Sequence, residues 1–122
     1  MMINVKDQVY AALCGVADNV SDVYPHEWAT LPAIQYTEED NSVYTKTDED
    51  EQYASLRYRV DIWDNKSTSL TAIDVDTALS GLGLVRTGCS DVADPSGMRH
   101  KVMRYEGIID VNTAVVYWNG SR

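Results

Sequence analysis

The stretch SLRYRVDIWD, residues 55–64, alternates apolar and polar side chains and is the clearest β-strand in the chain. One face carries Leu56, Tyr58, Val60 and Ile62, and the other carries Ser55, Arg57, Arg59, Asp61 and Trp63. The first face is typical of a strand that covers a hydrophobic core. Two arginines and a tryptophan on the second face need partners, either within the same chain or on a second molecule.

Working outward from this strand, the 122 residues predict one domain of class α+β. Helices are expected over residues 4–19, with Asn4 as N-cap, and over residues 65–84, with Gly83 at the C-terminal end. Further strands are expected at residues 33–39, 84–92, 99–110 and 113–118. Short connections between strands favour an antiparallel sheet with both helices on one face. Residues 1–122 are expected to form a single domain, because the sequence shows no domain linker and no internal repeat.

Residues 38–51, EEDNSVYTKTDEDE, form the most acidic part of the chain. One lysine against seven acids gives this segment a net charge of −6, out of −9 for the whole chain. The sequence leaves two alternatives open here, a long acidic loop or a hairpin with a charged tip. Val43 and Tyr44 are the apolar anchors of the segment.

Composition and motifs exclude several classes of function. A net charge of −9 and a pI near 4.4 oppose binding to a phosphate backbone. His26 has no second histidine four residues later, and SGLGL follows a helix, where it cannot hold a phosphate. No catalytic, cofactor-binding or metal-binding residue is assigned, and no enzyme is expected. Cys14 is expected as a buried free thiol.

Apolar side chains outside the predicted core favour self-association. Ala72, Val75, Ala78, Leu79 and Leu82 form the helix stripe expected to cover the sheet. Leu70 and Ile73 fall on nearly the opposite side of that helix, where a second copy of the chain is the expected contact. The candidate subunit interface comprises Arg57, Arg59, Trp63, Leu70, Ile73, Val43 and Tyr44.

The order of four segments resembles the tail terminator and tail completion proteins of long-tailed bacteriophages. These are VSDVYPHEWATLPAIQYTEEDNS (20–42), LRYRVDIWD (56–64), a helix ending LSGLGLVRT (79–87) and RHKVMRYEGIID (99–110). Within them, Leu31 and Pro32 open a strand, residues 61–63 read Asp-Ile-Trp before the central helix, and Gly83 and Leu84 follow that helix. The resemblance covers nearly the whole chain and contains no catalytic signature.

The resemblance implies an α+β subunit of a hexameric ring in the virion, assembled in the cytoplasm of the bacterial host. The ring would cap the tail tube and join it to the head connector, so the implied partners are copies of itself, the tail tube protein and a neck protein. DNA would pass through without specific binding. Two alternatives remain: a neck or connector protein of the same particle, and a small acidic cellular adaptor or DNA-mimic inhibitor. Mimicry fits less well, because two-thirds of the net charge lies in one segment.

Overall fold

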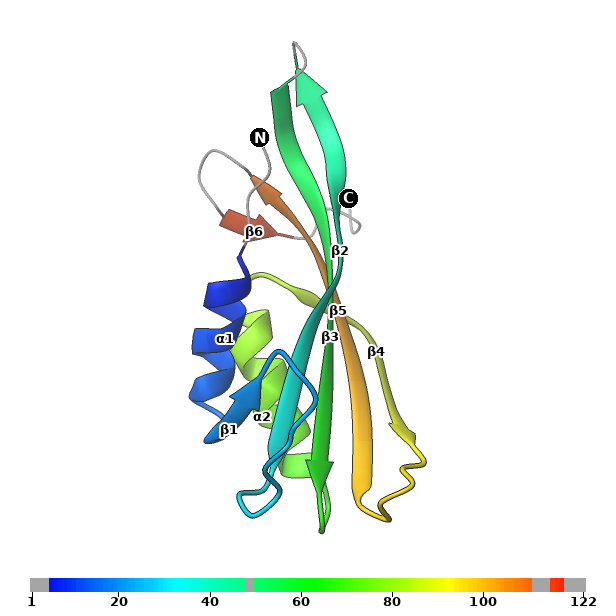
Figure 1. Ribbon diagram of the computed structural model, residues 1–122. Coiled ribbons are helices and arrows are strands. Elements are labelled where there is room, and N and C mark those ends of the chain that lie inside the picture. The colour runs from blue at the N-terminus through cyan, green and yellow to red at the C-terminus, as the bar shows by residue number, and fades with distance from the viewer. Residues whose placement is uncertain (1–4, 48–49, 111–114, 118–122) are drawn as a thin grey trace.

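The computed structural model describes residues 5–47, 50–110 and 115–117 (Figure 1). The chain order is α1 (Lys6–Cys14), β1 (Asn19–Ser21), β2 (Ala33–Thr47), β3 (Asp50–Asp64), α2 (Ser69–Ser80), β4 (Val85–Val92), β5 (Arg99–Asp110) and β6 (Val115–Tyr117). The structure confirms the expected α+β class.

The sheet has the strand order β1-β2-β3-β5-β4, and β6 pairs with β5. Every pair is antiparallel except β1 with β2, which run parallel. The sheet is therefore mixed, and the expectation of a purely antiparallel sheet is wrong at this edge. Strand β1 has only three residues, too few to produce a readable alternation of side chains. Residues 22–32 then cross back, so that β2 starts alongside β1 and runs in the same direction.

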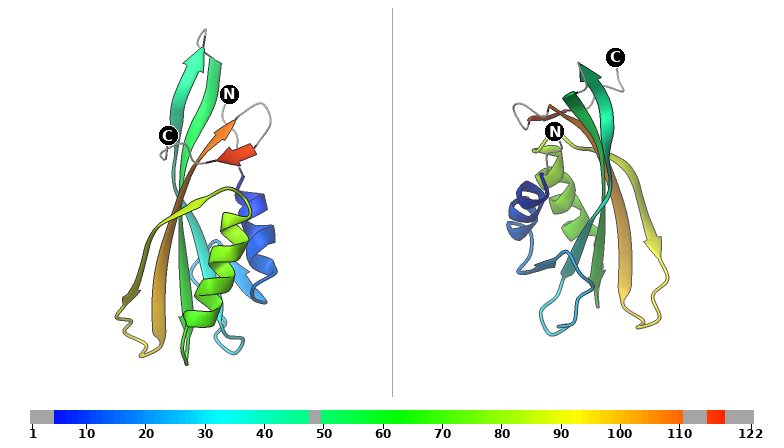
Figure 2. Two further views of the ribbon diagram at one scale, coloured as in Figure 1. Left: turned by 180° about the vertical axis from the view of Figure 1, so that it is seen from behind. Right: turned by 45° about the horizontal axis from the view of Figure 1, so that its top comes forward.

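Both helices lie on the same side of the sheet, as Figure 2 shows. Helix α1 contributes Val9 and Leu13 to the core, and α2 contributes its expected stripe of Ala72, Val75 and Leu79. These residues pack against the apolar face of β3 in one continuous cluster. Among the described residues, no helix is long and apolar enough to span a membrane.

Both helices are shorter than the sequence predicts. Helix α1 ends at Cys14, and Val16 and Val20 reach the core from the segment beyond it. Cys14 is a free thiol but is exposed, so the expectation that it is buried is wrong. The N-cap of α1 is Val5, and Asn4 lies outside the described residues.

The C-cap of α2 is Gly81, and the expected Gly83 instead closes the turn that follows it. The helix itself stops at Ser80, and Gly83 then adopts φ 96°, a conformation that favours glycine. This turn lets the Leu84 N–H donate to the Leu79 carbonyl.

The acidic segment forms a hairpin, and the alternative of a long loop is not confirmed. Residues 38–47 continue β2, residues 50–51 begin β3, and the two strands pair as far as Thr47 and Asp50. Residues 48–49 lie outside the described part of the chain. Figure 1 shows the β2–β3 hairpin projecting beyond both helices. The register shifts between Glu38 and Asp40 and again beyond Val43.

A hydrogen bond from Tyr58 links the base of this hairpin to the core. The Tyr58 side chain is fully buried, and its hydroxyl donates to Glu38 Oε1 at 2.6 Å. Burial raises the pKa of Tyr58, and the hydrogen bond to the Glu38 carboxylate raises it further. The Tyr58 hydroxyl is therefore protonated at neutral pH and donates this hydrogen bond.

The Tyr58→Phe variant is expected to lose about 1–3 kcal/mol of unfolding free energy, because this hydrogen bond goes to a charged acceptor. Urea denaturation followed by circular dichroism measures the change. Tyr36→Phe is the matched control, since Tyr36 is also buried but its hydroxyl has no hydrogen bond in the described chain. Equal losses in both variants would contradict the assignment.

Candidate functional site

The face of the sheet opposite the helices is the candidate site. On β3 the predicted alternation is confirmed: Leu56, Tyr58, Val60 and Ile62 are buried in the core shared with the helices. Arg57, Arg59, Asp61 and Trp63 occupy the alternate positions, which face away from α1 and α2. We call this surface the open face; Tyr24, Thr37, Glu39, Asp94 and His100 also contribute to it.

An aromatic cluster closes one end of the open face. Trp63 stacks on the His100 ring, with centroids 4.4 Å apart and planes at 21°. Tyr24 and Trp28, from the connection between β1 and β2, meet Trp63 edge-on at 5.5 and 5.7 Å. Trp63 is consequently only 3% exposed. Its own chain desolvates the indole, so little of its surface is left for the subunit contact expected from the sequence.

Two carboxylates hold His100 from either side. Asp61 is only 4% exposed, and its carboxylate accepts a hydrogen bond from His100 Nε2 at 2.7 Å. The same carboxylate accepts two hydrogen bonds from Arg59, one from Nε at 2.8 Å and one from Nη2 at 2.9 Å, and so forms a bidentate pair. Asp94 Oδ1 accepts the Trp63 indole N–H at 3.1 Å and lies 3.5 Å from His100 Nδ1.

Asp94 is itself fixed by its local turn. The Ser96 hydroxyl and the Ser96 backbone N–H both donate to Asp94 Oδ2. These bonds, the Ser96 hydroxyl first and then the Trp63 indole, hold the pKa of Asp94 below its usual value. Asp94 therefore remains an ionised acceptor well below neutral pH.

Glu39 organises the arginines farther along the open face. It sits where the β2–β3 register shifts between Glu38 and Asp40. Its carboxylate lies 3.4 Å from Arg57 Nε and 3.2 Å from Arg104 Nε. Arg57 and Arg59 thus find carboxylates within their own chain, Glu39 and Asp61 respectively. A role for these two arginines at a subunit interface stays a prediction.

The open face holds a shallow hollow of about 390 Å³ above these groups. His100 resembles the base of a catalytic triad because a carboxylate orients it, but no nucleophile completes the set. In the part of the chain that the structure describes, no hydroxyl or thiol is hydrogen-bonded to His100. Among those residues, no group of three or more His, Cys, Asp or Glu could hold a metal ion. The network is suited to fixing the shape of the face.

The other apolar residues of the predicted interface lie on two other elements. On α2, Leu70 is 78% exposed and Ile73 is 61% exposed, which confirms that both lie off the core stripe. On the β2 arm of the hairpin, Val43 and Tyr44 are 56% and 48% exposed. The two pairs lie on separate elements, α2 and β2. Their contact with a second copy stays a prediction.

Sequence reasoning missed Glu39, Asp94, His100 and Arg104. Trp63 meets His100 through the β3–β5 pairing, in which they are register partners. That pairing joins residues far apart in sequence, so the alternation within one strand gives no signal of it. A comparison with known protein families and with curated protein sequences finds no match to this chain.

Proposed function

We propose that this protein is a structural subunit of a long-tailed bacteriophage, which forms a ring that caps the tail tube and joins it to the head connector. The order of the four quoted segments supports this proposal, and the α+β fold agrees with what their resemblance implies. The observation that carries it is the exposure of Leu70, Ile73, Val43 and Tyr44 in a chain whose core is already complete without them.

The placement of these residues on two separate surfaces is compatible with a ring. Leu70 and Ile73 lie in the first half of α2, while Val43 and Tyr44 lie on the projecting hairpin. Figure 1 shows the start of α2 toward one end of the molecule and the projecting part of β2 and β3 toward the other. A contact between the α2 surface of one subunit and the hairpin of the next would be head-to-tail, and such contacts close into rings when the rotation permits.

The charge of the chain suits a channel through which DNA slides. At −9 the subunit repels phosphates, so it gains nothing from the release of counterions by DNA. Acidic residues concentrated in the hairpin leave the rest of the chain near −3, a distribution unlike the dispersed carboxylates of a DNA mimic.

Sedimentation velocity and negative-stain electron microscopy of the purified protein, alone and mixed with tail tubes, test the proposal. Ring-shaped oligomers are expected, either free or at the tube end. A strict monomer at high concentration that also fails to join tubes would overturn it. Salt-sensitive submicromolar DNA binding would instead favour a nucleic-acid function.

A further inference from the structure

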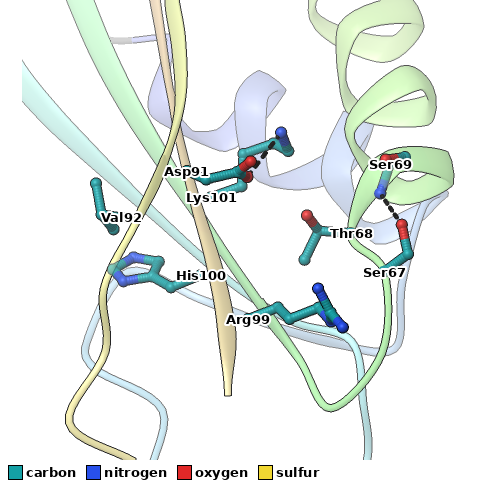
Figure 3. Close-up of a pocket in the computed structure, with 8 residues that line it drawn as sticks. All are labelled: Ser67, Thr68, Ser69, Asp91, Val92, Arg99, His100 and Lys101. Atoms are coloured by element: carbon teal, nitrogen blue, oxygen red, sulfur yellow. Dashed lines mark hydrogen bonds and ion pairs between the residues drawn. The ribbon is translucent and has the colours of Figure 1, made fainter. Parts of the chain in front are cut away.

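A second cavity lies on the other side of the sheet, where the start of α2 approaches β4 and β5. Its volume is about 290 Å³, and Ser67, Thr68, Ser69, Asp91, Arg99 and Lys101 are among the residues that line it. Figure 3 shows the hydroxyl-bearing residues on the α2 side and the charged residues on the strand side. His100 also lines this cavity and is the one residue that it shares with the open-face network.

The α2 N-terminus that borders the cavity is uncapped. Thr68 holds the N-cap position but makes no side-chain capping bond. The Ser67 hydroxyl accepts the Ser69 N–H at 3.3 Å, which leaves the following amides of the first turn without a side-chain partner. With 12 residues, α2 is long enough for its aligned peptide dipoles to favour negative charge at this end.

Thr68 supplies a second, independent indication of a ligand. The residue is only 4% exposed, and its hydroxyl makes no hydrogen bond within the described residues. The Thr68 hydroxyl opens onto the cavity and is not sealed in the core, so it is available to donate to an acceptor bound there. Figure 3 shows the side chain extending from the start of α2 into the space beside the two strands.

Two cations face the same space from β5. Arg99 and Lys101 alternate with His100 along the strand, so they point to the α2 side while His100 points to the open face. Lys101 Nζ pairs with Asp91 Oδ1 at 2.9 Å, and the Asp91 side chain is 79% exposed, so solvent screens this ion pair. Asp64, the register partner of Arg99, accepts the Asn65 N–H with its carboxylate.

We propose that this cavity is a binding site for a small oxyanion, phosphate or carboxylate. The first-turn amides of α2 and the Thr68 hydroxyl would donate to the oxyanion, and Arg99 and Lys101 would balance its charge. This inference goes beyond the proposed function, since a ring subunit does not require such a site. The site is a local cationic cavity in a chain of net charge −9.

Amide chemical shifts of the full ¹⁵N-labelled protein test the site during titration with inorganic phosphate to about 50 mM, and in a second series with acetate, at constant ionic strength. Saturable shifts are expected at the amides of residues 68–71. Thr68→Val and Arg99→Gln should each weaken binding about tenfold, the effect of losing one charge-assisted hydrogen bond.

Lys66→Gln is the matched control, because Lys66 is an exposed cation near the start of α2 that does not line the cavity. Its affinity should equal that of the wild type. A stronger response to phosphate than to acetate assigns a phosphate ligand, and the reverse assigns a carboxylate, such as one from a second copy. Absence of saturable shifts with both probes, or an equal loss in Lys66→Gln, would overturn the proposal.

Discussion

Replacing Leu70 and Ile73 together by aspartate is expected to weaken self-assembly by two to four orders of magnitude, roughly the loss of two buried aliphatic contacts. The stability of the isolated subunit should change by less than about 1 kcal/mol, because both side chains are largely exposed. Aspartate at position 70 also suits the first turn of a helix. Sedimentation velocity measures the assembly, and thermal denaturation measures the subunit.

Lys66→Asp is the control for charge, since it also changes the net charge by −2 at an exposed position. Assembly that survives in this variant but fails in the double variant assigns the effect to the apolar contact. If the double variant unfolds the subunit, Leu70 and Ile73 belong to the core and the proposed contact surface on α2 is wrong.

Trp63→Ala is expected to lower the unfolding free energy of the subunit itself, whereas the Leu70 and Ile73 double variant is expected to affect mainly assembly. The indole is 3% exposed, stacks on His100 and donates to Asp94. Removing it leaves a cavity and two partners without their contact, a change that costs about 3–5 kcal/mol for a buried tryptophan. Urea denaturation at low protein concentration measures this loss without contribution from assembly.

Trp63→Phe separates ring contacts from the hydrogen bond. It keeps an aromatic ring beside His100 but cannot donate to Asp94, so we expect a smaller loss of about 1–2 kcal/mol. If Trp63→Ala abolishes assembly but leaves subunit stability unchanged, Trp63 belongs to the subunit interface, as the sequence predicts.

The fold was largely predictable where one periodicity extends over a whole element. Alternation along β3 gave the strand and its buried face, and the stripe on α2 gave both its core contacts and the exposed positions of Leu70 and Ile73. The three-residue β1 offered no comparable pattern, and its parallel pairing with β2 depends on the path of an irregular connection.

The polar site was not predictable, because strand register creates it. Glu39 lies where the alternation of β2 is interrupted, so the sequence does not show which face it joins. His100 becomes the neighbour of Trp63 only once β5 has paired with β3. Thr68 precedes α2, and only the fold shows that this residue is largely buried and makes no capping bond.

The order of the strands also has a consequence for synthesis on the ribosome. The first 64 residues contain α1 and the β1–β2–β3 part of the sheet, whose neighbours are close in sequence. The strand that pairs with the other edge of β3 begins only at Arg99, after α2 and β4 have emerged. Until then β3 is a bare edge of the nascent chain, open to pairing with another polypeptide. The pairing of this edge depends on β5, a strand made late that lies in the interior of the finished sheet, between β3 and β4.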